Sequence, residues 1–377
     1  MFIYKREICN IIISQLRLNK VNVILGARRT GKTYLLKELV NKINAKTLLL
    51  NGEDFVTRDI LSFINKKNYE NLLADNKVLV IDEAQKIDNI GNILKFIVDT
   101  FSDIYIFASG SSAFDLSNKT GEPLTGRKFT YMLHPLAASE LMQKENYTQT
   151  IESIDEKLIF GSYPEIANEN NISTKRFLLN DLVNSYLLKD ILELDNLKNS
   201  AKLFTILKKL AFQIGNQVSI NELAGSVGLN NLTVERYLDL LTKVFVIFKL
   251  DGYSKNLRKE LTKQSKYYFW DLGIRNAIIN NFSTLSMRDD IGKLWENYII
   301  SEMLKKNSNN SDFTNFYFWR TYDRQEIDLI GENNGQLTAY EIKYNKQNVT
   351  IPAAWAKTYI NSKFEVINNK NYLNFLS

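Results

Sequence analysis

The chain is poor in the residues that build disulfide frameworks and most zinc sites. Among its 377 residues there is one cysteine, Cys9, and one histidine, His134. A single cysteine excludes an intramolecular disulfide, and one cysteine with one histidine is too few for a zinc site of the usual composition. A Ser-His-Asp triad would have to use His134, and no nucleophile motif accompanies it. We therefore expect His134 to be structural.

Long apolar runs are also absent. No run reaches the roughly 18–20 residues that cross a bilayer, and the first residues lack the layout of a signal peptide. A hydrophobic content of 45% is typical of globular proteins, and a net charge of +6 permits a nucleic-acid partner without requiring one. We expect a cytoplasmic protein of two or three domains that has no membrane-spanning segment.

The strongest pattern lies between an apolar run at 21–25, predicted to be a buried strand, and the amphipathic segment that follows. It fits G-x-x-x-x-G-K-[ST], in which backbone N–H groups and a helix N-terminus bind phosphate. Lys32 would add a positive charge for the phosphates, and the Thr33 hydroxyl would be a ligand of Mg²⁺. We predict a site for ATP and Mg²⁺ made by Gly26, Ala27, Arg28, Arg29, Thr30, Gly31, Lys32 and Thr33.

A second apolar run, at 77–81, ends in two acidic residues, Asp82 and Glu83. Asp82 would hold Mg²⁺ through water, and Glu83 would orient and polarise the water that attacks the phosphate. These two residues complete the predicted hydrolytic site.

Apolar strands that alternate with helices predict an α/β fold with a mostly parallel sheet, and its ligand would lie at the carboxyl ends of the strands. A further strand at 104–108 ends in serines. The hydroxyl of Ser109 or Ser111 would sense the γ-phosphate at this edge. Helix capping alone also favours serines here, so both interpretations stay open.

The chain resembles a subgroup of bacterial and archaeal AAA-type ATPases. The resemblance rests on the phosphate loop, on Asp-Glu-Ala-Gln at 82–85, on Gly126-Arg127, and on the later segments 161–165 and 269–275. It covers nearly the whole chain and implies an ATPase that works as a homo-oligomer. By position, Arg127 would reach a γ-phosphate, commonly that of a neighbouring subunit. Action within its own chain, or an ordinary surface arginine, is the alternative.

The middle of the chain has a winged helix-turn-helix outline. Helices are predicted at 201–214, 220–227 and 233–241, followed by extended segments at 245–250 and 267–270. The basic residues of the loop between the two extended segments are Lys255, Arg258, Lys259, Lys263 and Lys266.

A DNA contact would use the third of these helices and the basic loop. Arg236, beside Asn231 and Thr233, would face the DNA. The phosphates would be neutralised by Lys255, Arg258, Lys259 and Lys263. Glu235 and Asp239 on the same helix favour the alternative, a lid or packing module that does not touch DNA.

The last hundred residues carry a second chemical pattern. A predicted helix from 292 to about 306 contains Glu296, and a predicted hairpin carries Asp328, Glu341 and Lys343. Converging carboxylates need a cation, and oxygen-rich sites suit Mg²⁺ or Mn²⁺. Glu296, Asp328 and Glu341 would hold the metal. A water activated by it would attack a phosphodiester, positioned or deprotonated with the help of Lys343.

The predicted helix-β-β-β-helix-β order resembles the restriction-endonuclease-like, PD-(D/E)xK fold. Asp328 and the Glu341-x-Lys343 triplet match its motif, whereas Ile327 stands where the motif has proline. The resemblance implies a nuclease-like domain. The alternative is an ordinary surface Glu–Lys pair on a strand.

Four segments follow from these patterns. We expect an AAA-type ATPase domain at 1–145, a helical lid or linker at 146–198, a winged helix at 199–284 and a restriction-endonuclease-like domain at 285–377. The leading function is ATP hydrolysis coupled to DNA binding and to metal-dependent DNA cleavage. The alternative is a nucleotide-controlled switch or assembly protein whose C-terminal domain binds a partner without cutting.

Overall fold

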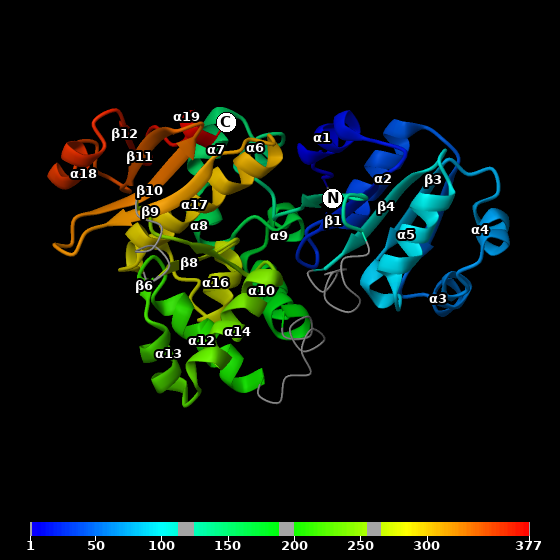
Figure 1. Ribbon diagram of the computed structural model, residues 1–377. Helices are drawn as coiled ribbons and strands as arrows, with labels where there is room; N and C mark the ends of the chain where they lie inside the picture. Colours follow the sequence, from blue (N-terminus) through cyan, green and yellow to red (C-terminus); the bar gives the residue numbers. More distant parts are fainter. Residues whose placement is uncertain (1, 112–123, 188–199, 255–264, 377) are drawn as a thin grey trace. The chain divides into compact units, whose positions relative to one another are not determined.

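A computed structural model describes residues 2–111, 124–187, 200–254 and 265–376 (Figure 1). The chain forms two compact units. The N-terminal unit is Lys5–His134, and the second unit combines Met1–Tyr4 with Pro135–Ser377. Among the described residues, no helix has the length and apolar character needed to cross a membrane.

The N-terminal unit is built on a five-stranded sheet in the order β2-β3-β4-β1-β5, in which all neighbouring strands are parallel. The strands are β1 Val21–Leu25, β2 Thr47–Asn51, β3 Val78–Asp82, β4 Tyr105–Gly110 and β5 Lys128–Met132. The helices are α1 Ile8–Gln15, α2 Lys32–Ile43, α3 Phe55–Ser62, α4 Lys66–Leu73, the short η1 Ala84–Lys86, and α5 Ile90–Thr100.

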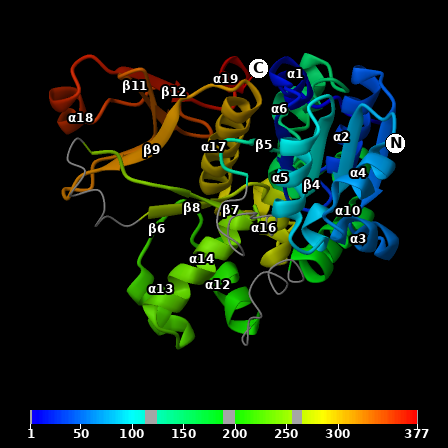
Figure 2. The ribbon, with the colours of Figure 1, turned by 45° about the vertical axis from the view of Figure 1, so that its right-hand side comes forward.

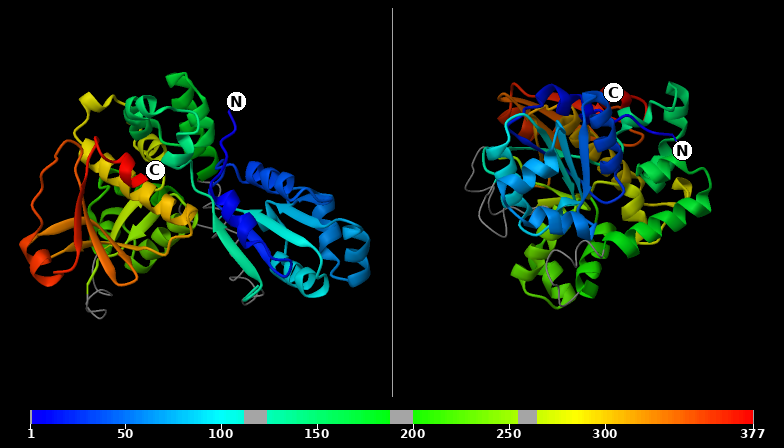
Figure 3. Two further views of the ribbon diagram at one scale, coloured as in Figure 1. Left: turned by 90° about the horizontal axis from the view of Figure 1, so that it is seen from above. Right: turned by 90° about the vertical axis from the view of Figure 1, so that its right-hand side faces the viewer.

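Helices lie on both faces of this sheet (Figures 1 and 3). In β3, Val78 and Val80 pack with residues of α1 and α2, whereas Leu79 and Ile81 pack with residues of α3, α4 and α5. This alternation is what the period of two in a strand requires of a sheet that is covered on both faces. The predicted α/β fold with a parallel sheet is confirmed in this unit. Ser109 belongs to β4 itself, which ends two residues later than the sequence indicated.

The second unit holds two sheets. One is antiparallel, in the order β6-β8-β7, and the other has the order β12-β11-β10-β9, in which only β11 and β12 are parallel. The strands are β6 Gln217–Val218, β7 Ile247–Leu250, β8 Ser265–Phe269, β9 Asn315–Arg320, β10 Glu326–Asn333, β11 Gln336–Ile342 and β12 Lys363–Ile367.

Helices surround these sheets, and the long helix α17 lies beside the four-stranded sheet (Figures 1 and 2). The helices before the first sheet are α6 Ala138–Leu141, α7 Tyr147–Glu152, α8 Ile154–Phe160, α9 Pro164–Asn168, α10 Ile172–Asp181, the π-helical η2 Leu182–Leu187, and α12 Ser200–Phe212. The others are α13 Ile220–Val227, α14 Asn231–Lys243, α16 Leu272–Ile278, η3 Leu285–Met287, α17 Ile291–Asn309, α18 Ala353–Thr358 and α19 Leu373–Leu376.

One apolar core runs through the three segments predicted for this part of the chain. Leu158, Leu207, Phe269, Trp295 and Leu329, drawn from all three, belong to a single buried cluster. The element order also follows the sequence pattern, with three helices around the β6-β8-β7 sheet and then helix-β-β-β-helix-β. The names winged helix and restriction-endonuclease-like domain stay predictions for these two parts.

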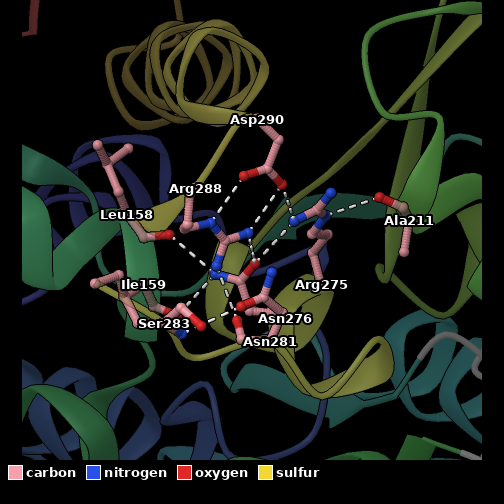
Figure 4. Close-up of polar contacts among 9 residues, drawn as sticks. All are labelled: Leu158, Ile159, Ala211, Arg275, Asn276, Asn281, Ser283, Arg288 and Asp290. Carbon is pink, nitrogen blue, oxygen red and sulfur yellow. Dashed lines mark hydrogen bonds and ion pairs between the residues drawn. The ribbon is translucent and has the colours of Figure 1, made fainter. Parts of the chain in front are cut away.

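A buried polar junction joins the parts of this unit (Figure 4). Asp290, just before α17, accepts hydrogen bonds from Arg275 on α16 at 2.7 Å and from Arg288 at 2.8 Å. Arg275 also donates to the carbonyl of Ala211 in α12 at 2.8 Å. Asn276 accepts from both arginines and donates to two carbonyl groups of α8. The junction therefore connects α8, α12, α16 and the start of α17.

A glycine is required where α8 meets α16. Gly161 follows α8 with φ 73°, in the left-handed region, and a Cβ added there would lie 2.1 Å from an Asp271 carboxylate oxygen. That carboxylate caps α16 by accepting from Ile274 N at 3.0 Å, and it also accepts from Ser162 N at 2.7 Å. A side chain at position 161 would therefore displace a buried cap.

We expect Gly161→Ala to lower the free energy of unfolding of the second unit by about 2–3 kcal/mol, because it combines backbone strain with loss of the Asp271 contacts. Tryptophan fluorescence during urea unfolding measures this change, since all four tryptophans lie in the second unit. Gly225→Ala in α13 is the matched control, because a Cβ there meets no atom within 4 Å. Equal stability of the Gly161→Ala variant and the wild type would contradict this account.

Candidate active site

Three neighbouring strands of the N-terminal sheet bring the predicted nucleotide residues together. The phosphate loop follows β1, Ser109 lies near the end of β4, and Asp82 ends β3. Thr33 donates a hydrogen bond from Oγ1 to Asp82 Oδ2 at 2.6 Å, and Ser109 donates from Oγ to the other oxygen of that carboxylate. The Asp82 carboxylate therefore joins the start of α2 to β4.

The phosphate loop is held by two cationic side chains. Lys32 Nζ donates to the carbonyls of Gly26 at 2.9 Å and Ala27 at 3.1 Å. Arg6, before α1, donates to the carbonyl of Thr30 at 2.6 Å and to that of His134 at 2.7 Å. Arg6 is buried, and its role was not predicted because no motif surrounds it in the sequence. Its two contacts fix the loop from the side of the chain that precedes β1.

The residues present fit a nucleotide with its Mg²⁺. The Thr33 hydroxyl and the Asp82 carboxylate, the predicted ligands, are within hydrogen-bonding distance of each other. Glu83 follows directly, and its backbone N–H donates to Ser109 Oγ at 3.2 Å. Of the two serines predicted to lie here, Ser109 is the one in contact with Asp82.

Arg127 lies at the amino-terminal ends of the strands, opposite the ends that carry the nucleotide residues. It directly precedes β5, and its carbonyl accepts from the N–H of Val21, at the start of β1. The phosphate loop comes after the far end of β1, one full strand away. The Arg127 side chain is 39% exposed and donates to Asp99 at 2.6 Å. Arg127 therefore lies near the start of β1, and the phosphate loop of its own chain follows the end of that strand.

The second candidate site lies where β10, β11 and α17 meet, and we call it the carboxylate–lysine centre. Lys343 Nζ lies 2.9 Å from Asp328 Oδ2 and 2.7 Å from Glu341 Oε1. Asp328 also accepts from Ile342 N at 2.8 Å. Asp328 lies in a β-bulge, where the pairing of β10 with β9 shifts register. Such bulges turn a side chain away from the regular alternation of the strand.

Four further residues complete the carboxylate–lysine centre, and three of them were not predicted. Glu296 on α17 accepts from Tyr268 OH at 2.5 Å and from Lys266 Nζ at 3.3 Å. Lys266 is 2% exposed and also pairs with Glu326 at 2.5 Å. The prediction that Lys266 belongs to the basic loop is wrong, because Lys266 lies on β8 and its side chain is buried. Lys266 and Tyr268 are two residues apart on β8, the spacing of one strand face, which was the available signal.

The predicted metal ligands are brought together only in part. Asp328 and Glu341 share Lys343, whereas Glu296 is held by Lys266 and Tyr268. Within the described parts of the chain, no three Asp, Glu, His or Cys side chains form a group that would hold a metal ion. One feature still fits a cation. Oε2 of Glu341 is buried and has no hydrogen-bond partner among the described residues.

Burial dominates the electrostatics of this centre. It raises the pKa of Glu296 to about 7, a shift that Lys266 opposes and Asp328 increases. Burial, with the charge of Asp328, also raises the pKa of Glu341. Burial alone would lower the pKa of Lys343, but the charges of Asp328 and Glu341 raise it above its usual value. Burial therefore shifts the pKa of Glu296 towards neutral pH.

The predicted DNA contacts are described only in part. Arg236 lies on the exposed side of α14, next to the exposed Glu235. The predicted wing residues, Lys255, Arg258, Lys259 and Lys263, lie outside the described residues.

Three family models match this chain, in chain order. Residues 18–142 match the model described as "AAA domain". Residues 151–285 and 291–369 each match a model described as a domain of unknown function, DUF8612 and DUF4143. The parallel α/β fold of the N-terminal unit and the first match agree, so this part is a P-loop domain of AAA type.

Similar chains occur in archaea and bacteria. A protein of Methanocaldococcus jannaschii is 27% identical over 93% of this chain and 81% of its own length. One of Mycobacterium tuberculosis is 25% identical over 91% of this chain and 74% of its own length. One of Haemophilus influenzae is 25% identical over 86% of this chain and 84% of its own length. All three are described as uncharacterized.

Solved structures give a weaker likeness. RuvB of Thermotoga maritima, described as a Holliday junction branch migration motor, is 19% identical over 65% of this chain and 90% of its own, with a TM-score of 0.33. The Pif1 helicase of Candida albicans is 16% identical over 48% of each chain, with a TM-score of 0.28. At these TM-scores neither likeness supports an inference about function.

The raised pKa of Glu296 predicts a pH-dependent stability. Between its ordinary value of 4.5 and about 7, the folded protein holds the proton more tightly than the unfolded chain does, so stability falls as pH rises through this window. Glu296→Gln removes the titration. We therefore expect the free energy of unfolding of this variant to rise relative to the wild type by on the order of 3 kcal/mol across the window.

Tryptophan fluorescence in urea at several pH values measures this difference. Glu53→Gln, at an exposed glutamate, is the control, and it should follow the pH trend of the wild type because it keeps Glu296. A difference between Glu296→Gln and the wild type that stays constant from pH 4.5 to 7.5 would show that Glu296 has an ordinary pKa.

Proposed function

We propose that the N-terminal unit binds and hydrolyses ATP. The observation that carries this proposal is the contact between Thr33 and Asp82, with Ser109 on the other oxygen of the same carboxylate. A hydroxyl at the start of a phosphate-loop helix and an acid at the end of a nearby strand are the pair that a Mg²⁺–nucleotide complex needs. Lys32 binds the β- and γ-phosphates, and Glu83 orients the attacking water.

Arg127 acts between subunits in this proposal. Arg127 lies at the amino-terminal ends of the strands, away from its own phosphate loop, and its side chain is 39% exposed. This position favours contact with the γ-phosphate bound by a neighbouring copy. An arginine in that place stabilises the charge of the transferred phosphoryl group in the transition state. The proposal therefore includes a homo-oligomer.

Two substitutions separate binding from hydrolysis. We expect Lys32→Ala to lose ATP binding, because the main cation of the phosphate site is removed. Glu83→Gln should bind ATP with wild-type affinity and hydrolyse it about 10²–10⁴-fold more slowly, the usual contribution of a general base. Isothermal titration with ATP and a phosphate-release assay measure the two properties. A Glu83→Gln variant with the wild-type rate would exclude the role of Glu83 in activating water.

The same assays test Arg127. Arg127→Ala should bind ATP normally and hydrolyse it poorly, and mixing it with Lys32→Ala should restore part of the activity, since each subunit supplies what the other lacks. Asp99→Ala is the matched control, because it removes the partner of Arg127 and leaves the guanidinium in place. Full activity of demonstrably monomeric wild-type protein would exclude the intersubunit role.

A second candidate function, metal-dependent cleavage of DNA, belongs to the carboxylate–lysine centre. Oε2 of Glu341 is buried and has no hydrogen-bond partner in the part of the chain that the structure describes, which favours a cation between Asp328 and Glu341. Such an ion would supply an activated water and neutralise charge on a phosphodiester. Lys343 would position that water, a role supported by its contacts with both carboxylates. DNA is the proposed substrate, and ATP turnover would control access to it.

Metal binding tests this function apart from activity. We expect Mn²⁺ to bind the wild type and to raise its thermal unfolding temperature by mass action. Asp328→Ala should lose Mn²⁺ binding and DNA cleavage, whereas Lys343→Ala should lose cleavage and keep the metal. Both should retain wild-type ATP hydrolysis. Wild-type protein that neither binds Mn²⁺ nor cleaves supercoiled, linear or single-stranded DNA would favour the alternative, a partner-binding module controlled by ATP.

A further inference from the structure

Gln85 is a polar residue whose side chain contacts Glu83. It lies in η1, the single turn that follows β3, and its Nε2 donates a hydrogen bond to Glu83 Oε2 at 2.6 Å. The turn brings Gln85 back towards Glu83, because Lys86 N donates to the carbonyl of Glu83 at 3.0 Å. The contact is short, and it involves the carboxylate proposed to orient the attacking water.

The backbone of Glu83 is held in an unusual conformation. Its φ is 49° and its ψ is 42°. These angles lie in the left-handed region, which few residues other than glycine and asparagine adopt. Its N–H donates to Asp82 Oδ1 at 3.1 Å and to Ser109 Oγ at 3.2 Å. On the carbonyl side, Gly52, the residue after β2, approaches so closely that a Cβ there would lie 2.3 Å from Glu83 O. Ser109 on β4 and Gly52, the residue after β2, therefore keep Glu83 in this strained position.

The amide of Gln85 adds a second unfavourable feature. A carboxylate only accepts hydrogen bonds, so the amide must present Nε2 to Glu83, and Oε1 points elsewhere. That oxygen is buried and has no hydrogen-bond partner among the described residues. Rotating the amide by half a turn would place Oε1 of Gln85 against the Glu83 carboxylate oxygen, and both of these atoms are acceptors. Among the described residues, the amide therefore keeps a donor on Glu83 while its buried oxygen has no partner, and an unpaired buried acceptor is costly for stability.

A strained backbone, a close glycine and an unpaired amide oxygen all converge on one carboxylate. Unfavourable features of this kind persist where they serve a functional arrangement. If Gln85 had only a structural role, its hydrogen bond to the half-buried Glu83 would not compensate for a buried amide oxygen that has no partner among the described residues.

We infer that Gln85 is a positioning residue for ATP hydrolysis, which fixes the orientation of the Glu83 carboxylate towards the attacking water. The inference rests on the proposed ATPase function. In the step concerned, the water oxygen bonds to the γ-phosphorus and the bond from that phosphorus to the bridging oxygen of ADP breaks. The electron pair leaves with ADP, and one water proton passes to Glu83 and then to the phosphate.

The decisive variant is Gln85→Leu, which keeps the size of the side chain and removes both amide groups. We expect kcat for ATP to fall by about 10²-fold, the usual effect of misplacing a catalytic group, while the Kd for ATP is unchanged. Thermal unfolding measured by circular dichroism should occur at the wild-type temperature or above it, because the unpaired oxygen is gone. Asp88→Asn, at an exposed acid three residues further on, is the control for local charge and should match the wild type in all three measurements.

A second variant distinguishes misplacement of the carboxylate from misfolding. The double exchange Glu83→Gln with Gln85→Glu keeps a carboxylate–amide pair and moves the carboxylate, so we expect it to bind ATP and to remain inactive. Wild-type kcat in Gln85→Leu, recovered activity in the double exchange, or loss of stability together with kcat would each overturn the inference. Wild-type protein that binds ATP without hydrolysing it would overturn the proposed function, and the inference with it.

Discussion

The hydrogen bond between Thr33 and Asp82 is the contact on which the nucleotide site depends, because it joins two strands that are not neighbours. The phosphate loop follows β1 and Asp82 ends β3, with β4 between them. The parallel register pairs Ile81 with Ala108 and Ile24 with Ser109, which brings the next residue, Asp82, level with Ser109. A shift of β4 by one residue would turn the Ser109 hydroxyl to the other face of the sheet, and Asp82 would lose the hydrogen bond from that hydroxyl.

Those parts of the site that depend on residues close together in sequence could be predicted from the sequence. The bounds of β1 and α13 agree with the predicted segments, because each is set by a local signal. For α13 that signal is the Ser-x-x-Glu capping box, and Ser219 indeed accepts from Glu222 N at 3.3 Å. The phosphate loop belongs to the same class, since its glycines, its lysine and its helix are consecutive.

Residues that act through distant partners could not be predicted in the same way. Lys266 is part of a basic stretch, and a charge run normally indicates a solvated surface. Only the pairing of β8 and its packing beside α17 and β10 show that this ammonium group is buried between Glu296 and Glu326. Arg6 is a similar case, since its role comes from carbonyl groups that are 24 and 128 residues away. Sequence patterns carry little information on such contacts.

In the carboxylate–lysine centre, ion pairs and hydrogen bonds connect residues on both sides of the boundary predicted after residue 284. Lys266 and Tyr268 come from before it, whereas Glu296 and Glu326 come from after it. Without β8, these two carboxylates would lose their buried cation, and an unpaired buried charge is strongly destabilising. The pair of Arg275 with Asp290 crosses the same boundary in the junction of Figure 4. The charge balance of the C-terminal sheet is therefore completed by the segment that precedes it, so any chemistry at this centre belongs to both parts together.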